Sequence, residues 1–259
     1  MSGEPRVTVV TGASQGIGRV IAREFGACGD VVVLAARNGA GLSETAEMVV
    51  ESGGTPMVVE TDVTSESSVA TMVEAVMGGH GRIDVLVNNS GIGGPSGRLW
   101  EVDPGEWKAT FEVNVFGVFL VTRAVLPVMV GQKRGSVVII GSISGKRPLF
   151  GRSAYTTTKT ALIGLTRTLA LEAGPDGIRV NLISPGFVSG PRIEWAIKAQ
   201  AEARGIEVDA VRGEFEGEAA LGRLTDPEDV ARAAVFLASD GAGGITGADL
   251  NVNSGVVMY

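Results

Sequence analysis

The sequence predicts an α/β fold in which helices cover both faces of a doubly wound parallel sheet. Short runs of β-branched apolar residues alternate with longer amphipathic segments along most of the chain. The first apolar run leads directly into a glycine-rich turn, as in nucleotide-binding folds of this class. The alternation breaks near residues 190–221, a charged stretch. We therefore expect one domain spanning residues 1–259, with residues 190–221 inserted into it.

Each expected element follows from a local pattern. The seven apolar runs expected to form strands are residues 7–11, 31–35, 57–60, 85–88, 136–140, 180–183 and 250–252. The helical crossovers are expected at residues 17–28, 41–52, 66–79, 106–129, 154–173 and 227–237. The inserted stretch contains two further helical segments, at residues 194–205 and 209–220. It is a candidate substrate lid, although a surface excursion without function fits the pattern equally well.

Composition excludes several classes of function. The chain has 259 residues, 44% of them hydrophobic, which is enough for a sizeable core. A net charge of −7 without a basic run argues against a nucleic-acid partner. The only cysteine, Cys28, cannot form an internal disulfide, and we find neither a signal peptide nor an uninterrupted apolar run of the ~18 residues expected of a membrane span. We therefore expect a cytoplasmic protein without membrane contact.

The turn after the first strand has the features of a nucleotide site. It reads Thr11-Gly12-Ala13-Ser14-Gln15-Gly16-Ile17-Gly18. Glycines let the backbone approach a pyrophosphate, and the N-terminus of the next helix offers free N–H groups. The spacing Gly-x-x-x-Gly-x-Gly differs from the commoner Gly-x-Gly-x-x-Gly, but its place between a strand and a helix favours cofactor binding. The expected contacts are Gly12, Ser14, Gln15, Gly16, Ile17 and Gly18.

Arg37 points to the form of the cofactor. When the adenosine ribose carries a free 2′-hydroxyl, the second strand normally ends in an acid. Here the strand runs into Ala36-Arg37-Asn38, and a guanidinium suits a 2′-phosphate. We infer NADP(H) in preference to NAD(H), which stays possible because Arg37 could also be a solvated turn residue.

Other short polar residues follow the third and fourth strands. In an open parallel sheet the ligand crevice lies at the carboxyl ends of the strands, where these residues fall. The same residue types also cap turns, and the two roles are compatible. The expected cofactor contacts of this group are Asp62, Val63, Asn89, Ser90 and Gly91.

The residues available for acid/base chemistry are few. His80 is the only histidine, and it lies in an expected loop at the amino end of the fourth strand, away from the crevice. With no second histidine and no cysteine cluster, neither a metal site nor a Ser-His-Asp triad can be assembled. Tyr155 and Lys159 are four residues apart and share a face if their segment is helical. A nearby cation favours the ionised phenol, so the pair could act as a general acid/base.

Taken together, Thr11 to Gly18, Asn88 to Gly91, Asn114, Ser142 and the Tyr155/Lys159 pair occur in one order over nearly the whole chain, which resembles a short-chain dehydrogenase/reductase. The resemblance implies a Rossmann-type sheet, a nicotinamide cofactor and a catalytic tetrad of Asn114, Ser142, Tyr155 and Lys159. Tyr155 and Lys159 would also contact the cofactor, as would Pro185, Gly186 and Val188 of a Pro-Gly loop. Family members are commonly homotetramers, or else homodimers.

The sequence departs from the family pattern at three places. Ser90 stands where alanine is frequent, and Gly190 where a threonine often contacts the carboxamide of the cofactor. Either Ser189 takes over this contact or the contact is lost. Residues 251–255 read Asn-Val-Asn-Ser-Gly in place of an Asp-Gly-Gly ending, which puts the C-terminal subunit contact in question.

The resemblance thus implies an NADP(H)-dependent oxidoreductase that interconverts a ketone or aldehyde and an alcohol, similar to a 3-oxoacyl reductase or a secondary alcohol dehydrogenase. Three alternatives are an NAD-dependent alcohol dehydrogenase of the same family, a non-catalytic cofactor-sensing protein, and a nucleotide-sugar epimerase or dehydratase. The intact tetrad disfavours the second, and the short C-terminal region the third. Phe150, Phe187 and Trp195 could give apolar contacts to a substrate, and Lys146, Arg147 and Arg192 could meet an anionic tail.

Overall fold

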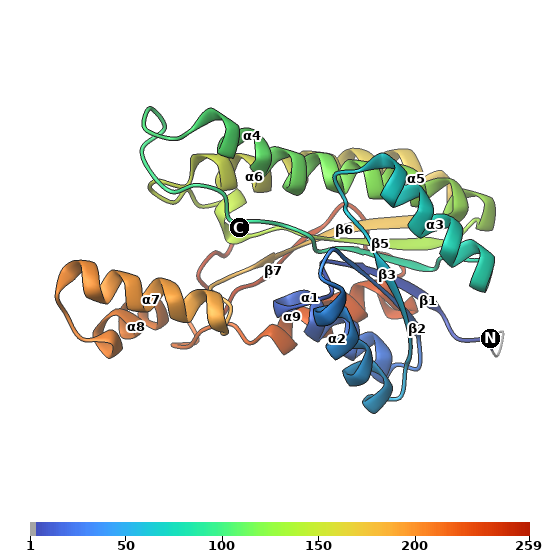
Figure 1. The fold of residues 1–259 in the computed structure, drawn as a ribbon, viewed down its shortest axis with the longest axis horizontal. Coiled ribbons are helices and arrows are strands. Elements are labelled where there is room, and N and C mark those ends of the chain that lie inside the picture. The colour runs from blue at the N-terminus through green and yellow to red at the C-terminus, as the bar shows by residue number, and fades with distance from the viewer. Residues whose placement is uncertain (1–3) are drawn as a thin grey trace.

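A computed structural model describes residues 4–259 and shows one seven-stranded parallel sheet (Figure 1). The strands are β1 (Val7–Thr11), β2 (Val31–Ala36), β3 (Thr55–Glu60), β4 (Val85–Asn88), β5 (Gly135–Ile140), β6 (Ile178–Pro185) and β7 (Asp249–Val252). Their order in the sheet is β3-β2-β1-β4-β5-β6-β7. The chain therefore reverses direction across the sheet after β3, and the crevice for a ligand lies between β1 and β4. The predicted fold class is confirmed.

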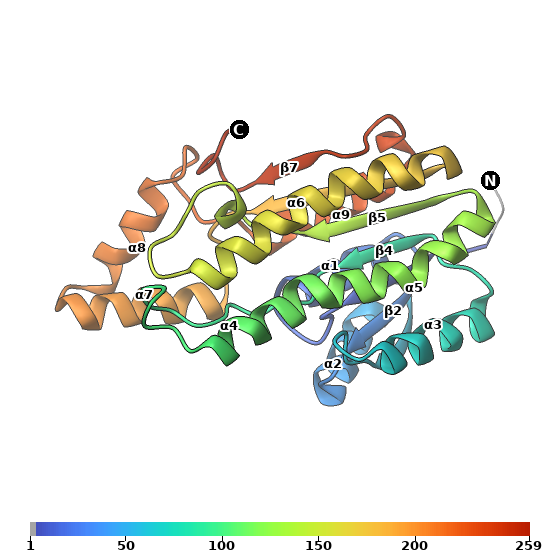
Figure 2. The same cartoon turned by 90° about the horizontal axis from the view of Figure 1, so that it is seen from above.

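Helices cover both faces of this sheet (Figures 1 and 2). One layer contains α3 (Glu66–His80), α4 (Pro104–Phe111), α5 (Gly117–Gln132) and α6 (Ser153–Ala173). The other contains α1 (Gly16–Ala27), α2 (Gly39–Glu51) and α9 (Pro227–Ala238). Because both faces are covered, β1, β2 and β4 are buried along their whole length and read as continuous apolar runs. Val9 belongs to the core under α3, α5 and α6, whereas its neighbour Val10 faces α1, α2 and α9.

Helices α4 and α5 are joined by a π-helical segment, η1 (Glu112–Phe116), where a single uniform helix was expected. The whole stretch Pro104–Gln132 is long and apolar enough to cross a membrane by those criteria alone. One side of it, including Val121 and Val125, is nevertheless packed into the core against the sheet. We therefore interpret it as a core helix of the α/β fold.

The inserted residues 190–221, here called the lid, form α7 (Pro191–Arg204) and α8 (Val208–Gly217), which extend beyond the carboxyl end of the sheet (Figure 1). Helix α8 ends earlier than the expected segment 209–220 because the chain turns back there towards the sheet. The lid has a small core of its own, made of Ile197, Ala201 and Val211.

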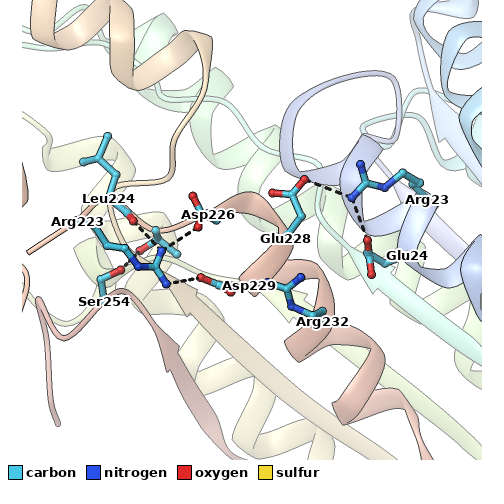
Figure 3. A network of polar contacts seen from close by, with 10 residues as sticks. Arg23, Glu24, Arg223, Leu224, Asp226, Glu228, Asp229, Arg232 and Ser254 are labelled. Atoms are coloured by element: carbon cyan, nitrogen blue, oxygen red, sulfur yellow. Dashed lines mark hydrogen bonds and ion pairs between the residues drawn. The ribbon is translucent and has the colours of Figure 1, made fainter. Parts of the chain in front are cut away.

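The chain returning from the lid is fixed to the helices below the sheet by a polar network (Figure 3). Arg223 donates hydrogen bonds to Asp226 at 2.9 Å and to Asp229 of α9 at 3.0 Å. The neighbouring Glu228 accepts from Arg23 of α1 at 3.2 Å. The base of the lid is thereby fixed to α9, which is itself paired with α1.

Two boundary expectations need correction. His80 is the last residue of α3 and not part of a loop, because Gly81 provides the left-handed C-cap with φ 67°. Strand β3 begins at Thr55 and not at residue 57, while its end at Glu60 is the expected one, with Asp62 and Val63 just beyond it. In both cases the side chains lie where they were expected, with His80 at the amino end of β4 and Asp62 and Val63 beyond the carboxyl end of β3.

Candidate active site

The turn from β1 to α1 has the geometry of an anion site. Gly12 and Gly16 have φ values of 65° and 57°, in the region that glycine adopts without strain. Gln15 caps α1 without a side-chain hydrogen bond, and the first turn of α1 contains no acid. The N–H groups at this helix end are thus left for a ligand, and Gly16 has open space where a Cβ would be. These features fit a dinucleotide pyrophosphate.

The glycine turn is locked to the end of β4. The Thr11 hydroxyl accepts hydrogen bonds from the N–H groups of Asn89 at 3.0 Å and Ser90 at 3.1 Å. Asn89 Nδ2 donates to the carbonyls of Thr11 at 3.0 Å and Gly12 at 3.2 Å. A Cβ on Gly18 would collide with Asn89 Nδ2 and the Gly12 carbonyl. Gly18 and Asn89 therefore shape the crevice by close packing.

Arg37, Asp62 and Val63 lie along the outer edge of the same crevice. Arg37 is exposed directly after β2. Hydrogen bonds from the backbone and hydroxyl of Thr64 hold the pKa of Asp62 below its usual value, and the charge of Arg37 contributes in the same direction. Val63 packs against Gly117 of α5. An exposed arginine at the end of β2 suits a ribose 2′-phosphate.

Tyr155 and Lys159 lie one turn apart on α6, as predicted. The Lys159 ammonium is buried, donates to the Ile140 carbonyl at 2.8 Å and lies 5.8 Å from the centre of the Tyr155 ring. Burial lowers the pKa of Lys159, since a desolvated ammonium is unfavourable. Burial alone would raise the pKa of Tyr155, but Lys159 and then Arg192, Ser142 and Arg152 lower it below its ordinary value. The phenol is thus set up to exchange a proton at lower pH than a free tyrosine.

Ser142 lies at the end of β5, beside the phenol. Its hydroxyl accepts a hydrogen bond from the Ser144 N–H at 3.1 Å and donates to the Ser144 hydroxyl at 3.2 Å. The short helix η2 (Ile143–Gly145) that follows fixes this arrangement. Ser142 therefore lies where a hydroxyl can bind a substrate oxygen.

Asn114 lies in the π-helical segment and is fully buried. Its amide exchanges hydrogen bonds with the backbone of Ile92, at 2.8 and 2.9 Å, and donates to Thr158 at 3.1 Å. A Cβ on Gly91 would lie 3.3 Å from Asn114 Oδ1 and 3.6 Å from Lys159 Nζ, so both groups face Gly91. Asn114 thus holds the loop that follows β4 beside the lysine, and these contacts also satisfy its buried amide.

The Pro-Gly loop after β6 completes the wall of the crevice. The Gly186 N–H donates to the Val252 carbonyl at 3.1 Å, and Val188 forms an isolated parallel bridge with Thr225. A Cβ on Gly186 would lie 2.8 Å from the Asn253 backbone. At the lid, Phe187 stacks edge-on against Phe215 of α8, with ring centres 4.8 Å apart. The loop therefore links the sheet to the lid.

Two arginines were missed by the sequence analysis. Arg152 lies 5.3 Å from the centre of the Tyr155 ring, but it is the non-helical N-cap of α6 and is held by Gly93 of a distant loop, so no local pattern indicates it. Arg19 braces the glycine turn by donating to the Ser14 carbonyl at 2.7 Å and to Glu44 of α2 at 2.6 Å. No local motif indicates the second contact, because it joins two helices.

Comparison with known proteins agrees with this geometry. A family model described as enoyl-(acyl carrier protein) reductase matches residues 12–257. The chain is 35% identical to 3-oxoacyl-(acyl-carrier-protein) reductase FabG of Pseudomonas aeruginosa, over all of both chains. It is 36% identical to cis-4-hydroxycyclohexanecarboxylate dehydrogenase of Sinomonas cyclohexanicum, over 96% of both. Two solved structures align with this chain with a TM-score of 0.92 each. The first is xylitol dehydrogenase bound to NAD+, which is 30% identical, and the alignment covers 98% of this chain and 100% of that one. The second is a variant of actinorhodin polyketide ketoreductase with NADPH, which is 32% identical over 98% of both chains.

The chain belongs to the short-chain dehydrogenase/reductase family. It is accordingly an oxidoreductase that interconverts C=O and CH–OH groups with NAD(P) as partner.

Proposed function

We propose that this protein is an NADP(H)-dependent carbonyl reductase, or the reverse alcohol dehydrogenase, that uses Tyr155 as its general acid/base. The observation that carries the proposal is the buried Lys159 ammonium one turn from the Tyr155 phenol, with the pKa of the phenol lowered, at the carboxyl edge of the sheet. A non-catalytic cofactor sensor would need the glycine turn but has no use for this pair.

In the reductive direction Tyr155 donates its proton to the carbonyl oxygen, and the alcohol and a phenolate result. The hydride for the carbonyl carbon would come from a reduced nicotinamide held in the crevice. Ser142 donates a hydrogen bond to the same oxygen and stabilises its developing charge. Lys159 stabilises the phenolate, and Asn114 holds the loop after β4 beside the ammonium.

For the cofactor, we propose that residues 12–18 bind the pyrophosphate and that Arg37 binds the 2′-phosphate of NADP(H). The uncapped end of α1 and the exposed guanidinium after β2 support this assignment. We further propose that Asp62, Val63, Asn89, Ser90 and Gly91 line the adenosine and nicotinamide ribose, and that Pro185, Gly186 and Val188 flank the nicotinamide.

For the surroundings of the site, we propose that residues 190–221 close over a small-molecule substrate and that the protein is a cytoplasmic homotetramer or homodimer. Phe116 of η1 and Phe119 of α5 remain exposed, with ring centres 5.5 Å apart, and Leu171 of α6 is also exposed. Large apolar side chains on neighbouring helices suit contacts between subunits. The lone cysteine is compatible with a reducing compartment.

Replacing Tyr155 by Phe tests the mechanism. We expect turnover to fall by about 10³-fold or more, because the proton donor is lost, while NADPH binding stays within about twofold. Oxidation of NADPH is followed by absorbance with a panel of ketones, and cofactor binding by fluorescence. Wild-type rates in the variant would contradict the mechanism, and bound NADPH with no ketone reduced by the wild type would favour the sensor.

A further inference from the structure

Two arginines beside the catalytic phenol have no role in the mechanism above. The guanidinium of Arg152 lies 5.3 Å, and that of Arg192 5.6 Å, from the centre of the Tyr155 ring, on which both can stack. With Lys159 at 5.8 Å, three cations surround one phenol. Within residues 4–259, neither arginine forms an ion pair with a carboxylate. The site therefore carries positive charge that a ligand could neutralise.

The two guanidiniums point to the same place. Arg152 donates to the Gly93 carbonyl at 2.8 Å and to the Ser96 hydroxyl at 2.8 Å. A Cβ on Gly93 would collide with Arg192 Nη2 and lie 3.0 Å from Arg152 Nη2. Burial and then the charge of Arg192 lower the pKa of Arg152, as expected when like charges approach each other. An anion between them would relieve this repulsion.

The other cations considered for an anionic substrate are already neutralised. Lys146 pairs with Asp249 at 3.0 Å and also donates to Asn251. Arg147 pairs with Glu218 at 2.7 Å. The sequence suggested Lys146, Arg147 and Arg192 as partners for an anionic tail. Among the described residues, Arg192 is the one of these three without a carboxylate partner, and Arg152 is in the same position.

We infer that the substrate is a small oxo acid, or the matching hydroxy acid, whose carboxylate binds Arg152 and Arg192 while its carbonyl oxygen meets Tyr155. This inference rests on the proposed function and names its substrate class. The planar forks of two arginines match a carboxylate. Because both lie against the catalytic ring, the anion and the ketone belong to one compact molecule. In a ketone carried on a phosphopantetheine arm, the phosphate would be a whole arm away.

The test compares oxo acids with their own neutral esters. Wild-type enzyme with NADPH is assayed on 4-oxopentanoate and 4-oxocyclohexanecarboxylate and on the methyl ester of each. We expect kcat/KM to favour the acids by about tenfold to a hundredfold, the usual size of a charge-assisted contact. Cyclohexanecarboxylate should compete with the ketone better than inorganic phosphate does.

The variants separate recognition from other roles. Arg192→Gln should fold, because the Arg192 side chain donates no hydrogen bond within residues 4–259, and its ratio of kcat/KM for acid to that for ester should fall to about one through a higher KM for the acid. Since Arg192 also lowers the pKa of Tyr155, the pH profiles on acid and ester should shift together, and the ratio is therefore compared at several pH values. Gly93→Ala keeps both charges but displaces Arg192, and should also weaken acid binding. Lys198→Gln removes an exposed charge from the same helix and serves as the matched control, with the preference intact.

Each other outcome overturns the inference. Equal losses on acid and ester in Arg192→Gln, with a shifted pH profile, would mean that Arg192 only tunes the phenol. Weaker NADPH binding in the same variant would assign the pair to a cofactor phosphate, and stronger competition by phosphate would assign it to a phosphoester. If esters are reduced in a Tyr155-dependent way without any preference for acids, the inference fails and the proposed function stands. If NADPH binds and no ketone is reduced, the proposed function fails as well.

Discussion

The cofactor edge of the crevice and the lid are stabilised in different ways. At the edge, four hydrogen bonds join Thr11 and Gly12 at the end of β1 to Asn89 and Ser90 after β4. A large cluster of buried apolar side chains lies between the sheet and the helices on each face. The lid has a core cluster of only three buried residues and exposed ion pairs such as Arg204 with Glu214. The first region is thus held by buried packing and hydrogen bonds and the second mainly by exposed ion pairs, which suits the proposal that the cofactor edge sets the reaction and the lid the substrate.

A Cβ at Gly18 should have the largest effect on the rigid side. In Gly18→Ala the methyl group would meet the Gly12 carbonyl and Asn89 Nδ2, so the turn must shift. We expect NADPH affinity to fall by at least about 100-fold and the free energy of unfolding by about 1–3 kcal/mol. Cofactor fluorescence titration and thermal unfolding measure the two effects.

Gly78→Ala is the matched control, since Gly78 lies in α3 with nothing near its missing Cβ. There the same substitution should raise stability by about 0.5–1 kcal/mol and leave cofactor binding unchanged. If the two variants behaved alike, close packing at Gly18 would not explain the rigid edge.

Lys159→Met should raise the pH at which the phenol acts. Burial raises the pKa of Tyr155 and Lys159 is the largest influence opposing it, so the pKa rises when the ammonium is removed. In the wild type, alcohol oxidation should increase with pH and level off above a midpoint below 10, because the phenolate is the base. Ketone reduction should decrease over the same range. We expect the midpoint to move upward and oxidation at pH 7 to fall about tenfold to a hundredfold.

Initial rates from pH 6 to about 10.5 would show this shift. An unchanged midpoint in Lys159→Met would mean that the surrounding arginines, and not the lysine, control the phenol.

Arg37→Asp should have a smaller effect, confined to the cofactor. A carboxylate after β2 repels a 2′-phosphate and accepts a hydrogen bond from a free 2′-hydroxyl. We expect the ratio of kcat/KM for NADPH to that for NADH to fall by about 10- to 100-fold. Arg37→Gln should lose the preference without gaining NADH activity. An unaltered ratio would remove Arg37 from the cofactor site.

The rigid edge was also the part that the sequence predicts best. Strands buried on both faces give continuous apolar runs, and the turn from Thr11 to Gly18 is a local motif. Both signals can be read from a short stretch of sequence, and the structure has a strand at each of the seven predicted places. Arg152 and its approach to Gly93 were missed, because the contact joins a loop after β4 to the start of α6. The π-helical segment at Asn114 was missed as well, since its hydrogen bonds to Ile92 depend on tertiary packing. Long-range polar contacts have no periodic signature in the chain.

The smallest effect is expected in the lid. Arg204 donates to both carboxylate oxygens of Glu214, and both side chains are about half exposed. Arg204→Gln should therefore change the stability of the whole protein very little, because exposed ion pairs are screened by water and salt. Global thermal unfolding should hardly change, while hydrogen exchange in α7 and α8 should become faster and KM for the ketone should rise by about twofold to threefold. High salt should give the wild type the same exchange pattern. If Arg204→Gln instead lowered the unfolding temperature as much as Gly18→Ala, the lid would be part of the rigid scaffold and the contrast between the two regions would be wrong.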